Sequence, residues 1–254
     1  MATPDHTRRF SGIERLYGAD SLVRLAAAHV CVVGIGGVGA WAVEALARSG
    51  VGRLTLIDLD HVAESNINRQ IHALENTLGQ AKVAAMKDRI AQINPVCAVE
   101  CSEEFITPDN VTTLLPNCDV VIDAIDQMRA KAALILCCRA RRTYIVTTGG
   151  AGGRVDPTRI RVDDLARTTQ DALASKLRAF LRKEHGFTRD PKKKFGVTCV
   201  YSDEPIRRPA SADFCDTDSG AVHGLNCAGY GSSVAVTASF GFAAAAQALD
   251  ILVK

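Results

Sequence analysis

Apolar runs and helix-periodic stretches alternate over the first 150 residues of the chain. Residues 30–34 (VCVVG) form an apolar, β-branched run of the kind that a parallel strand buried on both faces requires. This alternation predicts an α/β fold with a doubly wound, mainly parallel, Rossmann-like sheet. Further strands are predicted at 54–60, 93–105, 120–125 and 143–153, and helices at 40–48, 82–92, 108–115 (with Thr107 as N-cap) and 128–141.

Two regions of different character flank the part at 30–153. Residues 1–29 are predicted to form a helical arm, and residues 154–254 a C-terminal part within the same compact domain. Residues 234–253 are apolar over a length that a hydropathy scan would flag as membrane-spanning. This stretch is rich in alanine and carries four polar side chains. A helix in the core or in a dimer interface is therefore expected, with no stable insertion into a membrane.

The composition is typical of a protein in a reducing compartment. The 254 residues carry a net charge of +2, so bulk charge indicates no particular partner. The first ten residues contain no apolar segment typical of export, and the nine cysteines then argue against a disulfide framework. We expect a cytoplasmic location, with peripheral association with a membrane left open. No C-x-x-C pair occurs, so no zinc is expected; Cys137 and Cys138 are adjacent, and Cys199, Cys215 and Cys227 stand alone.

The C-terminal part contains a basic segment. Residues 161–208 carry 12 Lys and Arg against 7 Asp and Glu, concentrated at 176–194, where a helix predicted at 171–183 leads into a lysine-rich loop. Spaced cations of this kind suit a phosphate backbone, and a solvated helix face with an exposed loop is the alternative. The candidate contacts to a nucleic-acid phosphate backbone are Lys192, Lys193, Lys194, Arg178 and Arg182, and Arg207 and Arg208 are the alternative if these prove to be only solvated.

A glycine-rich turn follows the first predicted strand. Gly34, Gly36 and Gly39 have G-x-G-x-x-G spacing between a strand and a helix. Glycines let the backbone turn tightly and approach a phosphate, and the helix N-terminus presents free N–H groups to it. Asp58, at the end of the next predicted strand, is placed to bind ribose hydroxyls. The motif indicates a bound nucleotide, and a glycine turn without a ligand is the alternative.

Two cations that follow this motif point to a triphosphate. Residues 65–70 (SNINRQ) supply Arg69, and residues 79–82 (GQAK) supply Lys82. Fixed cations stabilise the charge that develops on a reacting phosphate, whereas a hydride-transfer cofactor would leave both side chains unexplained. The pattern therefore favours an ATP-using, adenylating enzyme over a nicotinamide-dependent oxidoreductase or a non-catalytic nucleotide-binding scaffold.

These motifs resemble those of the E1-like adenylyltransferase superfamily, which includes ubiquitin-activating enzymes and sulfur-carrier activators. The resemblance implies an E1-type adenylation fold that binds ATP and Mg²⁺. It implies that Asp58 binds ribose, that Asn66 and Arg69 bind phosphates, that Lys82 contacts the α-phosphate, and that Asp126 holds Mg²⁺. From the residues alone, Lys82 could equally be a solvated lysine, Asn66 a turn former and Asp126 an N-cap. The implied ATP-binding residues are Gly34, Gly36, Gly37, Gly39, Asp58, Asp60, Ser65, Asn66, Arg69, Gln70, Lys82 and Asp126, and the implied catalytic residues are Arg69, Lys82, Asp126 and Arg15.

Three longer segments narrow the resemblance. Residues 9–18 (RFSGIERLYG), 146–153 (VTTGGAGG) and 225–242 (LNCAGYGSSVAVTASFGF) are similar to those of the bacterial tRNA threonylcarbamoyladenosine dehydratases. That family implies tRNA bearing N6-threonylcarbamoyladenosine at position 37 as substrate. ATP would adenylate the threonyl carboxylate, and the carbamoyl group would then attack the activated carbonyl, expel AMP and close a ring. The alternative is an adenylyltransferase that activates the C-terminal glycine of a sulfur-carrier protein.

The resemblance also implies partners for the chain. Related enzymes form homodimers, and sulfur-carrier activators place an N-terminal arginine in the neighbouring subunit's ATP site. Gly12 stands at that point here, so Arg15 is the candidate for this contact and Arg9 the second, with a surface salt bridge as the alternative. Cys227 is expected to be a buried small side chain, with a redox or sulfur-transfer role as the alternative. A monovalent cation and a cysteine desulfurase or sulfur-acceptor system are further partners that the resemblance leaves open.

Overall fold

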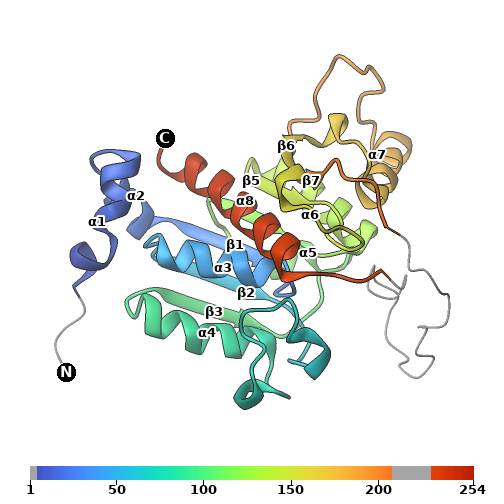
Figure 1. Cartoon of the computed structure of the whole chain (residues 1–254). Helices are drawn as coiled ribbons and strands as arrows, with labels where there is room; N and C mark the ends of the chain where they lie inside the picture. The colour runs from blue at the N-terminus through green and yellow to red at the C-terminus, as the bar shows by residue number, and fades with distance from the viewer. Residues whose placement is uncertain (1–4, 208–229) are drawn as a thin grey trace.

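A seven-stranded sheet forms the centre of the protein, which the computed structural model describes over residues 5–207 and 230–254 (Figure 1). The strand order is β3-β2-β1-β4-β5-β7-β6. Neighbouring strands are parallel except at one edge, where β6 runs antiparallel to β7. The predicted α/β fold with a doubly wound, mainly parallel sheet is therefore confirmed. The strands are β1 (His29–Val33), β2 (Arg53–Ile57), β3 (Ala98–Ser102), β4 (Val120–Asp123), β5 (Tyr144–Thr148), β6 (Ile160–Asp164) and β7 (Thr198–Ser202).

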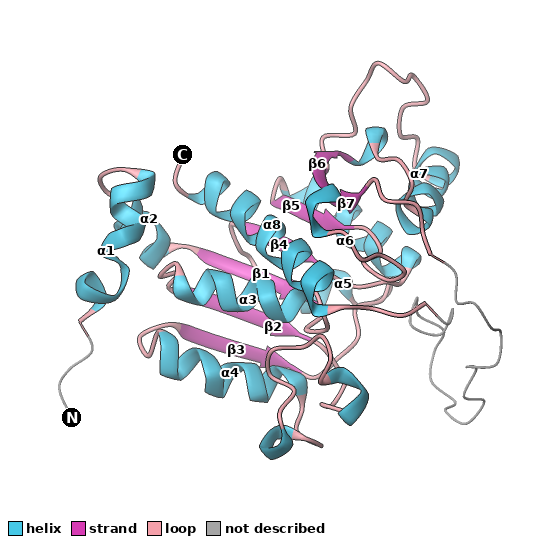
Figure 2. Ribbon diagram, viewed as in Figure 1, coloured by secondary structure: helices cyan, strands magenta, loops and turns pink. Residues whose placement is uncertain are grey.

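Helices cover both faces of this sheet (Figure 2). On one face α3, α4 and α8 pack with Val30 and Val32 of β1, and on the other α5, α6 and α7 pack with Cys31 and Val33. Successive side chains of a strand point to opposite faces, so a strand covered on both sides is apolar throughout. The helices are α1 (His6–Tyr17), α2 (Ser21–Ala27), α3 (Gly39–Arg48), α4 (Lys82–Ile93), α5 (Val111–Leu114), α6 (Met128–Arg141), α7 (Ala172–Glu184) and α8 (Val234–Leu252).

Some predicted elements differ from those observed. The strand predicted at 93–105 is only the five residues of β3, and the helix predicted at 108–115 is the single turn α5. The N-cap of α5 is Asn110 rather than Thr107. The Thr107 N–H donates to Asn110 Oδ1 and the Asn110 N–H donates to Thr107 Oγ1, so the two residues close a turn that delays the start of the helix. Strands β6 and β7 were not predicted at all.

The turn between β1 and α3 depends on two glycines. Gly34 has a φ of 86°, a conformation that favours glycine. A Cβ atom on Gly39 would overlap the carbonyl oxygen of Gly34. Because no side chain separates these two backbone segments, α3 starts directly below the loop, and its N-terminus lies beside the end of β1.

Helix α8 lies across the sheet against α3, with Val236, Phe240 and Ala244 in the core. It is the one helix among the described residues that is long and apolar enough to cross a membrane, and half of that apolar window is buried. A core helix passes the same test of length and composition. The expectation of a core helix is thus confirmed for the buried face of α8, which carries Val236, Phe240 and Ala244.

We expect Gly39→Ala to destabilise the fold, because its methyl group would overlap the backbone oxygen of Gly34, which has no rotamer to move away. Overpacking costs about 1–3 kcal/mol, and a backbone clash belongs at the upper end of that range. Gly36→Ala is the matched control, since nothing lies within 4 Å of its added Cβ. Thermal unfolding should show a lowered Tm for Gly39→Ala alone; equal Tm values for both variants would contradict the packing argument.

Candidate active site

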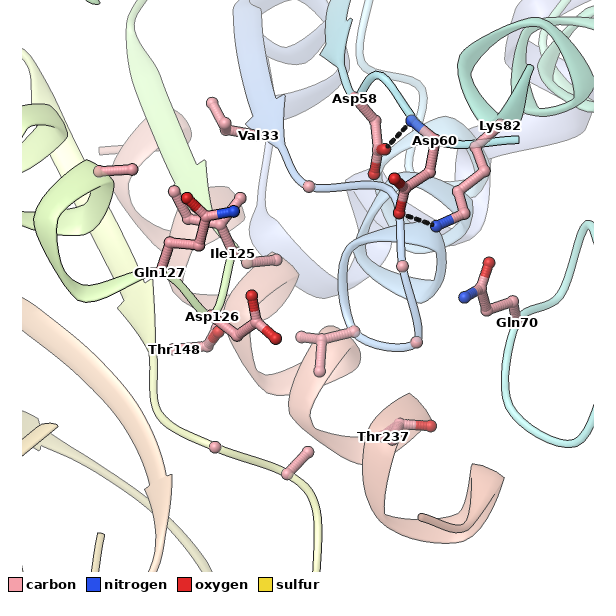
Figure 3. Close-up of a pocket in the computed structure, with 18 of the residues that line it drawn as sticks. Val33, Asp58, Asp60, Gln70, Lys82, Ile125, Asp126, Gln127, Thr148 and Thr237 are labelled. Carbon is pink, nitrogen blue, oxygen red and sulfur yellow. Dashed lines mark hydrogen bonds and ion pairs between the residues drawn. The ribbon is translucent and has the colours of Figure 1, made fainter. Parts of the chain in front are cut away.

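A pocket opens at the carboxyl ends of the central parallel strands (Figure 3). The strand order reverses between β1 and β4, and open parallel sheets bind ligands at such a switch point. Two residues of the predicted ATP-binding set do not line the pocket: Gly39 lies below the turn, and Ser65 accepts hydrogen bonds from Arg69 Nη1 at its carbonyl oxygen and from Asn66 Nδ2 at its hydroxyl. The predicted residues that do line it are Gly34, Gly36, Gly37, Asp58, Asp60, Asn66, Arg69, Gln70, Lys82 and Asp126.

Asp58 is fixed just beyond β2 by two backbone donors. The Ile35 N–H donates to Asp58 Oδ2 at 2.5 Å, and the Asp60 N–H donates to Oδ1 at 2.8 Å. Burial raises the pKa of the Asp58 carboxyl above its ordinary value, while the nearby Lys82 charge and the two N–H donors oppose that shift. One carboxylate therefore ties the glycine-rich loop to the end of β2 at the edge of the pocket.

Lys82 is the first residue of α4, and its ammonium lies in the pocket. Its Nζ is 2.7 Å from Asp60 Oδ2. The Lys82 side chain is 7% exposed and the Asp60 side chain 54% exposed, so the alternative of a solvated lysine is wrong. Because the carboxylate partner is half exposed, water can hydrate Asp60 when Lys82 moves to another anion.

Arg69 comes from the long loop between β2 and α4. Its Nη1 donates to the Ser65 carbonyl oxygen at 2.6 Å and to Asn68 Oδ1 at 2.9 Å. The Arg69 carbonyl oxygen accepts hydrogen bonds from Trp41 Nε1 at 2.9 Å and from Thr237 Oγ1 at 3.5 Å. Burial lowers the pKa of Arg69 from its ordinary value, although a guanidinium remains charged at neutral pH. The backbone of this residue is therefore held from α3 and α8 together.

Two buried amide side chains line the same wall. Asn66 Oδ1 accepts the Ala63 N–H at 3.1 Å, so Asn66 stabilises its own turn, as its alternative role predicted. Gln70 is 5% exposed, and its Oε1 has no hydrogen-bond partner among the described residues. A buried acceptor without a donor costs free energy.

Asp126 lies in the loop between β4 and α6, with its carboxylate directed into the pocket beside Thr148 (Figure 3). The N-cap of α6 is Gln127, so the alternative that Asp126 caps this helix is wrong. No group of three or more His, Cys, Asp or Glu side chains within 5–207 and 230–254 is arranged to hold a metal ion. Mg²⁺ commonly binds through one or two carboxylates together with substrate phosphates, so Asp126 fits this ion in company with a triphosphate.

The predicted N-terminal arginines lie outside the pocket of their own chain. Arg15 is exposed on α1, and its Nη1 donates to Ser11 Oγ at 3.3 Å. Arg9 donates to the carbonyl oxygen of Ile93 at 2.7 Å, at the C-terminal end of α4. Arg9 is thus bound within its own subunit, whereas Arg15 stays a prediction that concerns a second subunit. Cys227 lies outside the described residues.

In the basic segment, the lysines are exposed to solvent, whereas two arginines contact other residues of the same chain. The lysines at 192–194 are exposed in the loop between α7 and β7. Arg178 donates to the Thr168 hydroxyl, and Arg182 lies over the ring of Phe195 at 5.3 Å from its centroid. Both arginines therefore stabilise the fold, and the lysines are the stronger candidates for a phosphate partner.

Sequence reasoning missed two parts of the site. Phe105 and Ile106, which follow β3, line the pocket together with Ile125 and form an apolar wall. Their position at the end of the strand predicted at 93–105, which included Phe105 as its last residue, was a usable signal, because the carboxyl ends of parallel strands meet at one edge. The second part is the fully buried pair of Asp123 and Lys131 below this wall. An aspartate at the end of an apolar strand was its only sequence signal.

Known proteins are similar to this chain along nearly its whole length. Residues 11–254 match the model of the ThiF family. The tRNA threonylcarbamoyladenosine dehydratase of Haemophilus influenzae is 46% identical over 252 residues (98% of this chain, 95% of that protein). The Escherichia coli enzyme of the same name is 51% identical over 247 residues (95% and 92%). The crystal structure of Escherichia coli tRNA N6-threonylcarbamoyladenosine dehydratase in complex with ATP aligns with a TM-score of 0.87 at 48% identity, covering 99% of this chain and 97% of that one. The chain therefore belongs to the ThiF family, the E1-like group that its motifs predict.

Proposed function

We propose that this protein catalyses the ATP-dependent dehydration of N6-threonylcarbamoyladenosine in tRNA. The observation that carries the proposal is the convergence of Asp58, Lys82 and Arg69 on one pocket, in a chain that matches dehydratases over more than nine tenths of both lengths. An ATP site with two buried or half-buried cations suits carboxylate adenylation. The second candidate, activation of a sulfur-carrier protein, has no specific support among the described residues.

The first chemical step forms an acyl adenylate. A threonyl carboxylate oxygen bonds to the α-phosphorus of ATP, and the bond from that phosphorus to the leaving pyrophosphate breaks. Negative charge then builds on the α-phosphate and on the pyrophosphate. We infer that Lys82 leaves Asp60 and, with Arg69, stabilises this charge. Asp58, already fixed by two N–H donors, orients the ribose.

The second step closes a ring within the substrate. The carbamoyl group attacks the activated carbonyl carbon, AMP leaves, and the carbamoyl nitrogen loses a proton to solvent. Because both reacting groups belong to one nucleoside, proximity supplies much of the acceleration, and no cysteine nucleophile is required. We expect Thr148 and Thr237 to border the modified base, since they line the pocket on the side away from Asp58 (Figure 3).

Asp126 is the proposed protein ligand of Mg²⁺. Its carboxylate would share the ion with phosphate oxygens of the nucleotide, as the donor preference of Mg²⁺ requires. The ion, when bound, supplies positive charge that neutralises the triphosphate. Asp126 thereby also orients the nucleotide on the side of the pocket opposite Lys82.

The proposed tRNA surface is the lysine loop at 192–194. Its lysines are exposed, but the chain that follows them is anchored, because both oxygens of Asp164 accept backbone N–H groups. The donors are Phe195 at 2.8 Å, Gly196 at 2.7 Å and Val197 at 3.1 Å. Cations on an anchored loop lose less conformational entropy on meeting a phosphate backbone than those on an unanchored one.

A homodimer formed through α3 and α8 is also proposed. Phe242 is 46% exposed on the outer face of α8 and packs edge-to-face on Trp41, with 5.7 Å between ring centroids. Ala235 and Ala246 extend the same exposed face; Ser239 lies between them with its hydroxyl donating to the Ala235 carbonyl oxygen, and Asp250 follows Ala246 by one turn, so the apolar part is centred on Phe242. An apolar face of this kind favours a protein partner. A second copy of the chain would cover it and would bring another Arg15 into the assembly.

Other features remain proposals without a structural test. The protein is expected to act in the cytoplasm. A monovalent cation and a cysteine desulfurase or sulfur-acceptor partner stay predictions, because nothing within the described ranges bears on them. The role of Cys227 stays a prediction for the same reason.

We expect Lys82→Ala and Arg69→Ala to lower the rate of ATP–pyrophosphate exchange by about 10²–10³, because each removes a fixed cation from the phosphate site. The fold should persist in Lys82→Ala, since the half-exposed Asp60 stays hydrated without its partner. Lys87→Ala, an exposed lysine on the same helix, is the matched control and should keep the parent rate. Parent-like exchange by Lys82→Ala or Arg69→Ala would sink the assignment of the ATP site.

Phe242→Glu should convert the dimer to monomers, because it places a charge in the middle of the apolar face. Sedimentation should give twice the 27.1 kDa chain mass for the parent and the single mass for the variant. Ala84→Glu, at an exposed position of α4, is the control and should sediment like the parent. A parent that sediments only at 27.1 kDa in the micromolar range would rule out the dimer.

Replacing Lys192, Lys193 and Lys194 together by alanine should weaken tRNA binding and flatten its salt dependence. Each lost phosphate contact removes about one unit from the slope of log affinity against log salt. The ATP dissociation constant should stay unchanged, because the loop contributes nothing to the pocket. Unchanged tRNA affinity and salt slope would show that these lysines are only solvated.

A further inference from the structure

A completely buried ion pair lies below the pocket. Lys131 Nζ is 3.0 Å from Asp123 Oδ1, and the two side chains are 1% and 0% exposed. Removing two charges from water costs several kcal/mol per ion, and replacing such a pair by apolar residues is often neutral or stabilising. Stability alone therefore does not account for this pair, and its contacts suggest a different use.

Both members of the pair bind the loop that follows β4. Lys131 Nζ donates to the carbonyl oxygens of Ile125 at 2.8 Å and Asp123 at 3.4 Å, in addition to the Asp123 carboxylate. The Ile125 N–H donates back to Asp123 Oδ1 at 3.3 Å. Lys131 lies near the start of α6 and reaches back across that end of the helix. The short loop that carries Asp126 is thus held at its N–H and C=O groups immediately before that residue.

The neighbouring strand β5 completes this arrangement. Thr147 Oγ1 donates to Asp123 Oδ2 at 2.5 Å, and Thr148 Oγ1 donates to the Asp123 carbonyl oxygen at 3.2 Å. The three protons of the Lys131 ammonium then have three acceptors, and both carboxylate oxygens of Asp123 have donors. A polar network in which every group is satisfied is rigid and holds one geometry.

We propose that Lys131 and Asp123 are positioning residues that hold the 124–127 loop so that Asp126 meets the nucleotide–Mg²⁺ complex in one orientation. The proposal deepens the proposed ATP-dependent function and rests on it. Neither side chain reaches the pocket, so both act through the loop backbone. A network that only stabilised the fold could be replaced by neutral groups of similar size without loss of activity. A positioning network could not be replaced in this way, because the loop before Asp126 would lose the hydrogen bond from Lys131 Nζ to the Ile125 carbonyl oxygen.

The decisive variant is the neutral pair Asp123→Asn with Lys131→Met. Its Tm should fall only slightly, because neither buried charge is left unpaired and only the carbonyl oxygens of Asp123 and Ile125 lose a donor. Its kcat for ATP–pyrophosphate exchange should fall about 10–100-fold, the usual effect of removing a group that orients a metal ligand, and more Mg²⁺ should be needed for half-maximal rate. The ATP dissociation constant measured by calorimetry without Mg²⁺ should stay close to the parent value. Lys87→Met provides the control, with parent-like values throughout.

Thr147→Val provides a second variant in case the double variant does not fold. It removes only the donor to Asp123 Oδ2, and Thr147 does not line the pocket. It should shift the Mg²⁺ requirement in the same direction by a smaller factor. Parent-like kcat and Mg²⁺ requirement in a folded variant would overturn the proposal, and so would an equal loss of ATP affinity with and without Mg²⁺. The ATP dissociation constants with and without Mg²⁺ are both measured in the absence of tRNA. Their ratio therefore tests the positioning of Asp126 independently of whether the parent protein dehydrates the modified nucleoside.

Discussion

The reversal of strand order between β1 and β4 is the constraint on which the site depends. β2 lies on one side of β1 and β4 on the other, so the loops that leave β1 and β4 diverge and open a space at their carboxyl ends. Asp58, after β2, and Asp126, after β4, then face this space from its two sides. The close contact of Gly34 with Gly39 directs the start of α3 to the same space. Residues far apart in the chain thus form one pocket because of topology, before any side-chain contact is considered.

The cations of the pocket have internal partners that a ligand can replace. A buried cation without a partner would be costly, since it would lose its hydration without compensation. Lys82 is neutralised by Asp60, whose carboxylate is half exposed, and Arg69 is bonded to a backbone carbonyl and to Asn68. Both cations are therefore stable without a phosphate and remain in place to receive one. Asp58 differs, because its two N–H donors fix the carboxylate itself.

Local patterns were sufficient to predict the elements that surround the pocket. The apolar runs of β1 and β4 and the amphipathic helix that begins at Lys82 follow from the sequence pattern, and α6 follows from its high content of helix-forming residues such as alanine, leucine and arginine. Strand β6 reads IRVDD and is partly exposed at the edge of the sheet, so it lacks the apolar run of a central strand. The Asp123–Lys131 pair could not be predicted, because its meaning depends on burial of both side chains, which the sequence does not show.

Helix α8 contributes both to the proposed ATP pocket, through Thr237, and to the exposed face that carries Phe242. Near its N-terminal end, Thr237 donates to the carbonyl oxygen of Arg69, while Trp41 of α3 donates to the same oxygen. The indole of Trp41 also packs against Phe242, on the outer face of α8. The aromatic pair that a second subunit would cover is therefore one hydrogen bond away from the backbone of Arg69, the arginine proposed to bind phosphate. Packed helices shift as units rather than deform. We therefore expect that a partner which fixes the rings of Trp41 and Phe242 also restricts the backbone conformations of Arg69, through the hydrogen bond from Trp41.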